Sequence, residues 1–148
     1  MTTFETSVRI RRPIEDVFAF LSEPLNFPRW NSAVRAVEKT RGRESEVGST
    51  YTMERELPTG RVQNELEIFA REHPTEFGIR TTSGPTPFSY RYAFSAANGQ
   101  TAVQLDAVLE LDGAAALLGP LMGRAAKHGV DDNLAELKRI LETHVPPS

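Results

Sequence analysis

The chain has 148 residues, 39% of them hydrophobic and 25% charged, as expected for one globular domain spanning residues 1–148. The formal net charge is -3 with both signs interspersed, which argues against a nucleic-acid partner, because phosphate binding needs concentrated Lys and Arg. The absence of cysteine excludes disulfides, thiolate nucleophiles and cysteine metal sites.

The first predicted element is a strand over residues 4–11, where apolar and polar side chains alternate. Glu5 and this alternation are not typical of a signal peptide, and no apolar run approaches the roughly 20 residues that span a bilayer. We therefore expect a cytoplasmic protein that does not insert into a membrane.

A helix is predicted next, because Pro13 suits the first helical turn and an apolar stripe follows it. The stripe has the i, i+3, i+4, i+7 spacing of an amphipathic helix and consists of Ile14, Val17, Phe18 and Leu21. Pro24 ends this helix, and a second, short helix is expected over residues 25–31, interrupted or started by Pro28.

Alternation with period two then continues along the chain and predicts antiparallel strands with one wet and one buried face. Tight turns are expected at residues 58–60, 73–75 and 98–99, where Pro, Gly and Asn-Gly occur. The predicted strands cover residues 34–40, 50–57, 61–68, 77–81, 88–95 and 101–111.

The buried face of this sheet needs a cover, and the only long candidate is a helix from Ala114 to about Thr143. Its sheet-facing side carries mostly small residues in the first half and larger ones in the second. We therefore expect a cavity beneath the first half and a packed core beneath the second. The alternative is that Gly119 and Gly129 simply allow the helix to approach the sheet closely.

The walls of the expected cavity follow from strand parity and from the small-faced half of the helix. The predicted lining residues are Tyr51, Met53, Arg55, Asn64, Leu66, Phe77, Ile79, Tyr90, Tyr92, Leu118, Met122 and Ala126. Arg55 has two interpretations: its guanidinium faces inward and needs an anion or carboxylate partner, or it lies near the strand end and reaches water. Asn64 and Asn133 are expected to anchor a polar end of a ligand or to bond to backbone.

The spacing of apolar, Pro and aromatic residues over residues 8–31 resembles the N-terminal signature of the SRPBCC superfamily. This is the START-like, helix-grip group, and the resemblance is to its polyketide cyclase/dehydrase-like branch; residues 133–142 resemble the end of its long helix. The resemblance implies an α+β helix-grip fold. A curved seven-stranded antiparallel sheet would wrap around the long C-terminal helix, with two short helices between strands 1 and 2. Trp30 matches the family's tryptophan at one end of the cavity, and anchoring the short helices is the alternative role.

The resemblance implies binding of an apolar small molecule, of lipid, polyketide or aromatic type. The few titratable groups among the expected lining residues favour a binder without catalysis. Two alternatives stay open: a polyketide cyclase/dehydratase-like enzyme, and a protein-interaction module in which Leu117 and Leu121 form a partner or homodimer surface. No catalytic residue can be transferred from the family. The three histidines are scattered, and neither a metal site nor a cofactor is expected. The acidic strand residues Glu54, Glu56, Glu65 and Glu67 lie on the wet face by parity.

Overall fold

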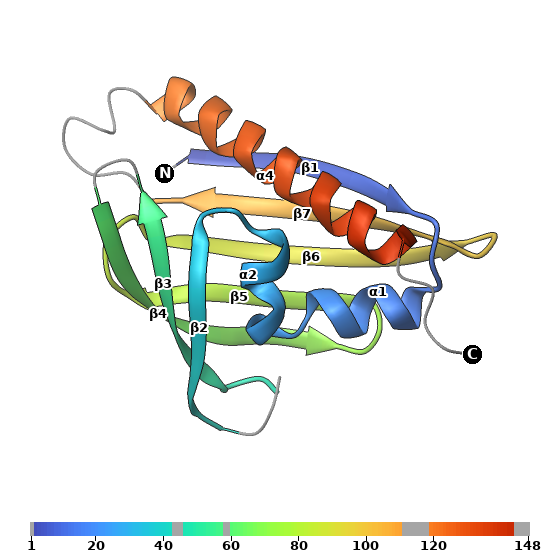
Figure 1. The fold of residues 1–148 in the computed structure, drawn as a ribbon, viewed down its shortest axis with the longest axis horizontal. Helices are drawn as coiled ribbons and strands as arrows, with labels where there is room; N and C mark the ends of the chain where they lie inside the picture. The colour runs from blue at the N-terminus through green and yellow to red at the C-terminus, as the bar shows by residue number, and fades with distance from the viewer. Residues whose placement is uncertain (1, 43–45, 58–59, 111–118, 144–148) are drawn as a thin grey trace.

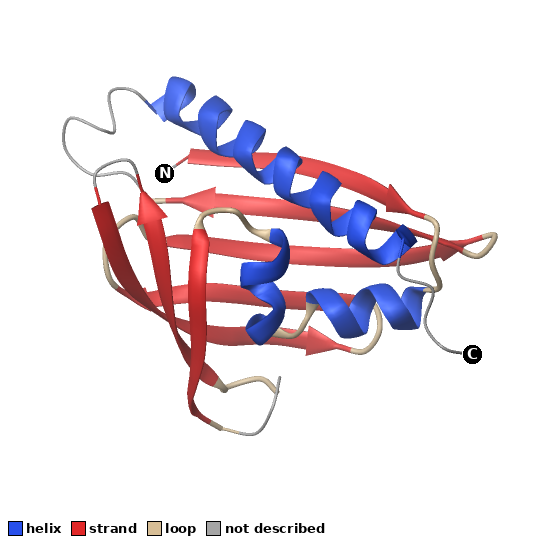
Figure 2. Ribbon diagram, viewed as in Figure 1, coloured by secondary structure: helices blue, strands red, loops and turns tan. Residues whose placement is uncertain are grey.

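The protein, described here from a computed structural model, is a curved antiparallel sheet with helices on one face (Figures 1 and 2). The structure describes residues 2–42, 46–57, 60–110 and 119–143. In chain order the elements are β1 (Thr2–Ile10), α1 (Ile14–Leu21), a 3-10 turn η1 (Pro24–Asn26), α2 (Phe27–Trp30), β2 (Val34–Arg41), β3 (Thr50–Leu57), β4 (Gly60–Glu72), β5 (Glu76–Ser83), β6 (Phe88–Ala97), β7 (Gln100–Leu109) and α4 (Gly119–Thr143). The predicted helix-grip architecture is confirmed.

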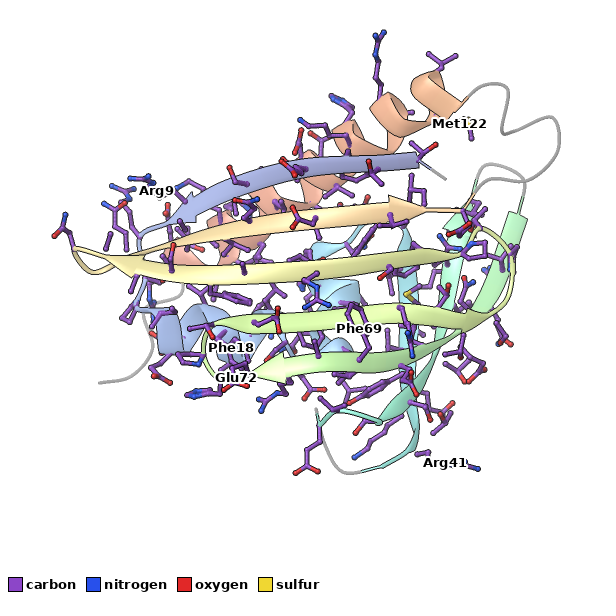
Figure 3. All side chains as sticks on the ribbon, turned by 180° about the vertical axis from the view of Figure 1, so that it is seen from behind. Arg9, Phe18, Arg41, Phe69, Glu72 and Met122 are labelled. Carbon is purple, nitrogen blue, oxygen red and sulfur yellow. The ribbon has the colours of Figure 1, made fainter. Side chains whose placement is uncertain are left out.

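The seven strands lie in the order β1-β7-β6-β5-β4-β3-β2, and every neighbouring pair is antiparallel. Burial alternates along the strands, so one face is wet and the other carries the core. Strand β4 is longer than predicted and contains a register shift between Ile68 and Ala70. Such a bulge bends a strand, and the ring of Phe69 lies on the face of the sheet away from the helices (Figure 3). Gly78 is required beneath it, because an added Cβ would lie 2.6 Å from the Phe69 ring.

The short segment between α1 and β2 is divided near Pro28, as the sequence predicts. Pro24–Asn26 forms a 3-10 turn, in which the carboxylate of Glu23 accepts a hydrogen bond from the Leu25 N–H. The four-residue helix α2 begins only at Phe27 and contains Pro28 near its start. Proline fits the first turn of a helix, which explains why a new helix begins there.

Helix α4 lies along the edge strand β1, as Figure 1 shows. Polar contacts join the two elements: Asp131 accepts a hydrogen bond from the Thr6 hydroxyl, and the Lys138 ammonium donates to the Arg9 carbonyl at 2.7 Å. Gly123 permits the close approach, because a Cβ there would lie 2.8 Å from Cγ2 of Thr2. The first part of the predicted helix, residues 114–118, lies outside the described residues. No helix in the described part of the chain is both long and apolar enough to cross a membrane.

The core fills the space between the concave face, α1 and the C-terminal half of α4. Its members are apolar side chains with little or no exposure, among them Ile10, Phe18, Leu21, Phe77, Leu134 and Leu137. The C-terminal half of α4 therefore packs on a dense core, as its large residues predict.

Candidate ligand-binding pocket

A pocket of about 170 Å³ opens where β2, β3 and β6 meet α4 and the chain after α2. It borders the middle of α4, at small or medium residues, rather than its first turns. The lining residues are Asn31, Ala33, Val34, Met53, Arg55, Phe88, Tyr90, Ala126, Gly129, Val130 and Asn133. A volume of this size compares with the ~150 Å³ cavity that accepts benzene, and is below the ~300 Å³ typical of drug-sized pockets.

Arg55 is the charged residue of this pocket, and it is held by neutral oxygens. Its Nε and Nη2 donate to Oδ1 of Asn64 at 3.0 and 2.7 Å, and Nη2 also donates to the Pro85 carbonyl at 3.1 Å and to the Thr86 hydroxyl. The guanidinium lies 5.7 Å from the centre of the Phe88 ring. Partial burial lowers the pKa of Arg55, and the nearby Tyr90 hydroxyl opposes that shift. Within the described part of the chain, Arg55 has no carboxylate partner.

Asn64 connects Arg55 to the loop between β5 and β6. Its side chain is 1% exposed, and its Nδ2 donates to the carbonyls of Pro85 and Ser83 at 2.8 and 3.3 Å. Gly84 has a positive φ of 101°, and a Cβ there would lie 2.4 Å from the Gln63 carbonyl oxygen. The loop therefore lies directly on β4, and Asn64 and the loop residue Pro85 both hold the Arg55 side chain.

Tyr90 from β6 lies near this cation, and Tyr92 follows it on the same face of the strand. Burial raises the pKa of Tyr90 to about 12, and Arg55 counteracts part of that rise. Burial likewise raises the pKa of Tyr92, and the neighbouring Tyr90 adds to the effect. Both phenols are thus protonated at neutral pH and are hydrogen-bond donors. Among the described residues neither hydroxyl has a hydrogen-bond partner, and the ring of Tyr90 packs 4.6 Å from that of Phe88.

Asn133 presents an amide from α4 on the other side of the pocket. Its Oδ1 accepts hydrogen bonds from the Ser32 N–H at 3.2 Å and the Ser32 hydroxyl at 3.3 Å. The backbone N–H can only donate, so the carbonyl end of the amide faces Ser32 and the NH₂ end faces away from it. The Nδ2 has no hydrogen-bond partner in the described ranges.

The structure brings five of the residues predicted for the site to the pocket: Met53, Arg55, Tyr90, Ala126 and Asn133. Asn64 is one contact away through Arg55. The others that point inward belong to the dense core and do not border the pocket: Tyr51, Leu66, Phe77, Ile79 and Tyr92. Their proposed contact with a ligand stays a prediction.

Two more predicted residues, Trp30 and Met122, do not line the pocket. Trp30 is 5% exposed in α2 and packs edge-on against Phe27 with ring centres 5.8 Å apart, one residue before the pocket residue Asn31. Met122 is 42% exposed on the first turns of α4, and Figure 3 shows it at the end of that helix. Leu118 lies outside the described residues.

Sequence reasoning did not include Phe88, Ala33 and Asn31 among the site residues, although all three line the pocket. Phe88 shares strand parity with Tyr90, and this signal was available from the alternation in residues 88–95. Asn31 and Ala33 come from the connection between α2 and β2, whose path has no periodic signature. Gly129 does not serve to bring the helix close to the sheet, which was the alternative to a cavity, because a Cβ at this residue would meet nothing within 4 Å.

Other polar groups lie away from this pocket. His128 and Asp132 form a pair at 3.6 Å on the outer side of α4, with side chains 82% and 72% exposed. Glu65 and Glu67 accept hydrogen bonds from Thr52 and Arg80 on the wet face, as their parity predicts.

The described ranges contain no group of three or more His, Asp or Glu that could hold a metal ion. Leu121 is 63% exposed, whereas Leu117 lies outside the described residues, so a homodimer contact stays a prediction.

Residues 1–142 match the family described as polyketide cyclase / dehydrase and lipid transport, and the chain belongs to that family. This confirms the predicted SRPBCC, START-like relationship. A comparison with curated proteins gives no match.

Solved structures show the same fold. A START superfamily protein from Mycobacterium smegmatis is 14% identical, with a TM-score of 0.80 over 97% of this chain and 99% of the other. A protein from Thermus thermophilus is 15% identical, with a TM-score of 0.79 over 93% and 94% of the two chains. The di-domain ARO/CYC protein StfQ of the steffimycin biosynthetic pathway is 12% identical, with a TM-score of 0.75 over 95% of this chain and 45% of its own. At these identities the similarity establishes the fold alone.

Proposed function

We propose that this protein binds an apolar small molecule between the concave face of the sheet and helix α4, without transforming it. One observation carries the proposal: a pocket opens at the small-faced middle of α4, next to a core that is densely packed elsewhere. Met53, Val34 and Phe88 supply apolar walls, and only a few polar groups face the interior. This combination is typical of sites that bind apolar molecules and orient them.

The family supports the same proposal, since its description includes lipid transport. The pocket volume of about 170 Å³ limits the enclosed part of the ligand to roughly one ring or a short chain. A larger lipid or polyketide would extend through the pocket opening.

A cyclase or dehydratase activity is the alternative, and it requires a group that takes up a proton. The polar side chains that line the pocket are a guanidinium, a phenol and amides, which donate hydrogen bonds or stay neutral at pH 7. Their chemistry supports binding more directly than proton abstraction. Single replacement of Arg55, Tyr90 and Tyr92 would test the alternative: a large loss of turnover of a bound ligand in any of them would favour an enzyme.

Native mass spectrometry of the protein purified from its own source tests the proposal. We expect a retained apolar molecule in the wild type and its loss in Gly129→Leu, because a side chain at residue 129 would enter open space at the pocket. Ala135→Leu is the matched control on the exposed side of the same helix, and it should retain the molecule. Equal retention in both variants would contradict the proposed location.

A further inference from the structure

We infer that the pocket recognises an acidic oxygen group, a carboxylate in the simplest case, at the polar end of its apolar ligand, with Arg55 as the principal contact. This inference rests on the proposed function and adds the chemical class of the ligand.

The first support is the unused hydrogen-bonding capacity of Arg55. Four of its contacts use Nε and Nη2, and all of them end on neutral oxygens of Asn64, Pro85 and Thr86. Its Nη1 has no hydrogen-bond partner in the part of the chain that the structure describes, and Arg55 borders the pocket. A partly buried guanidinium whose contacts are all neutral oxygens favours binding of an anion. A hydrogen bond between two charged groups is about twice as strong as one between neutral groups.

The second support is the polarity of the neighbouring groups. The Tyr90 phenol stays protonated at neutral pH and can donate a hydrogen bond. The Asn133 amide turns its carbonyl to Ser32, and its NH₂ end has no partner among the residues that the structure describes. Three donors from three elements, β3, β6 and α4, thus border one pocket. A ligand that satisfies them must supply acceptor oxygens, and a carboxylate offers two oxygens with about four acceptor positions.

The third support is that the guanidinium is already oriented. Asn64, itself 1% exposed, accepts two hydrogen bonds from Arg55, while the centre of the Phe88 ring lies 5.7 Å from the central carbon of the guanidinium. Such a side chain loses little rotamer freedom when a ligand binds. Asn64 therefore acts as a positioning residue and does not itself contact the ligand.

Calorimetric titration with matched acid and amide probes tests the inference on the wild-type protein. Octanoate is compared with octanamide, and 1-naphthoate with 1-naphthamide, so that aliphatic and aromatic acids are distinguished. We expect at least one acid to bind about 10-fold or more tightly than its amide, as the loss of a hydrogen bond to a charged group predicts. Equal affinity of acid and amide in both pairs would overturn anion recognition and leave apolar binding intact. Absence of binding by all four probes would overturn both proposals.

Variants locate the effect. Arg55→Gln should remove the preference for the acid, reducing octanoate affinity about 10-fold or more while octanamide affinity changes little. Arg35→Gln is the matched control: Arg35 lies on the neighbouring strand β2, is 47% exposed and pairs with Glu56. It should keep the full acid preference. If both variants lose it equally, or Arg55→Gln keeps it, Arg55 is not the anion contact; the wild-type acid-to-amide ratio stays decisive should Arg55→Gln fail to fold.

Discussion

The two halves of helix α4 meet the same sheet in different ways. Towards its C-terminus, Leu134, Leu137 and Leu141 are at most 7% exposed and complete a dense core with Ile10 and Phe18. In its middle, the helix offers smaller contacts, and a pocket with three donor groups opens beside it. Side-chain size along a single helix thus decides where the sheet is filled and where it can accept a ligand.

The packed half should be the more sensitive to loss of volume. Leu137 is fully buried, so Leu137→Ala should lower the free energy of unfolding by about 2–5 kcal/mol through lost burial and a new cavity. Urea unfolding measures this change. Probe binding to the folded variant should persist, and a loss below about 1 kcal/mol would mean that this half is not the rigid part of the structure.

Asn64 holds the pocket residue Arg55 against the loop between β5 and β6, and its removal should have the next largest effect. Asn64→Ala would remove the side-chain donor to the carbonyls of Ser83 and Pro85 and the acceptor of two Arg55 hydrogen bonds, at a cost of about 1–3 kcal/mol in unfolding free energy. Gln63→Ala, on the exposed side of the same strand, is the control and should change stability by at most about 0.5 kcal/mol. Equal effects would show that the Asn64 contacts add nothing to stability.

Glycine replacements sharpen the comparison within the helix. Gly129→Ala should stabilise the fold by up to about 1 kcal/mol, because alanine favours helix and its Cβ meets nothing within 4 Å. Gly123→Ala should gain less or lose stability, since its Cβ would lie 2.8 Å from Thr2. Thermal unfolding of the two variants measures the difference. The same gain in both would contradict the close approach of α4 to β1.

The pocket half should also respond to alkaline pH. A tyrosine in the unfolded chain ionises near its ordinary pKa of 10.0, whereas Tyr90 in the fold ionises with a pKa of about 12. The unfolded state therefore loses its proton first, and the free energy of unfolding should fall as pH rises from about 10 to 12. Below that range both states keep the proton, and Tyr90 causes no change of stability with pH. Urea unfolding combined with tyrosinate absorbance measures the fall, which should be smaller in Tyr90→Phe. An unchanged profile in that variant would assign the effect to other groups.

Alternation along the strands was sufficient to predict which side chains face inward, because a period of two fixes the face of every residue once the sheet is known. Tyr51, Leu66 and Ile79 are buried accordingly. Parity does not say whether an inward residue meets the core or the pocket, because that depends on how α4 crosses the sheet. The bulge near Phe69 and the partners of Arg55 depend on non-local contacts, and neither has a periodic signal in the sequence.

The most direct test that a ligand binds beside the middle of α4, and not in the packed core, is a ¹H–¹⁵N NMR titration of the wild-type protein with octanoate. The largest shifts are expected at the Arg55 Nε–H, the Asn133 side-chain amide and the backbone amide of Gly129, which all belong to the pocket. The amides of Phe18 and Leu137 in the packed half should move little. Shifts of equal size in both halves, or none at the pocket residues, would contradict the assignment of the ligand site.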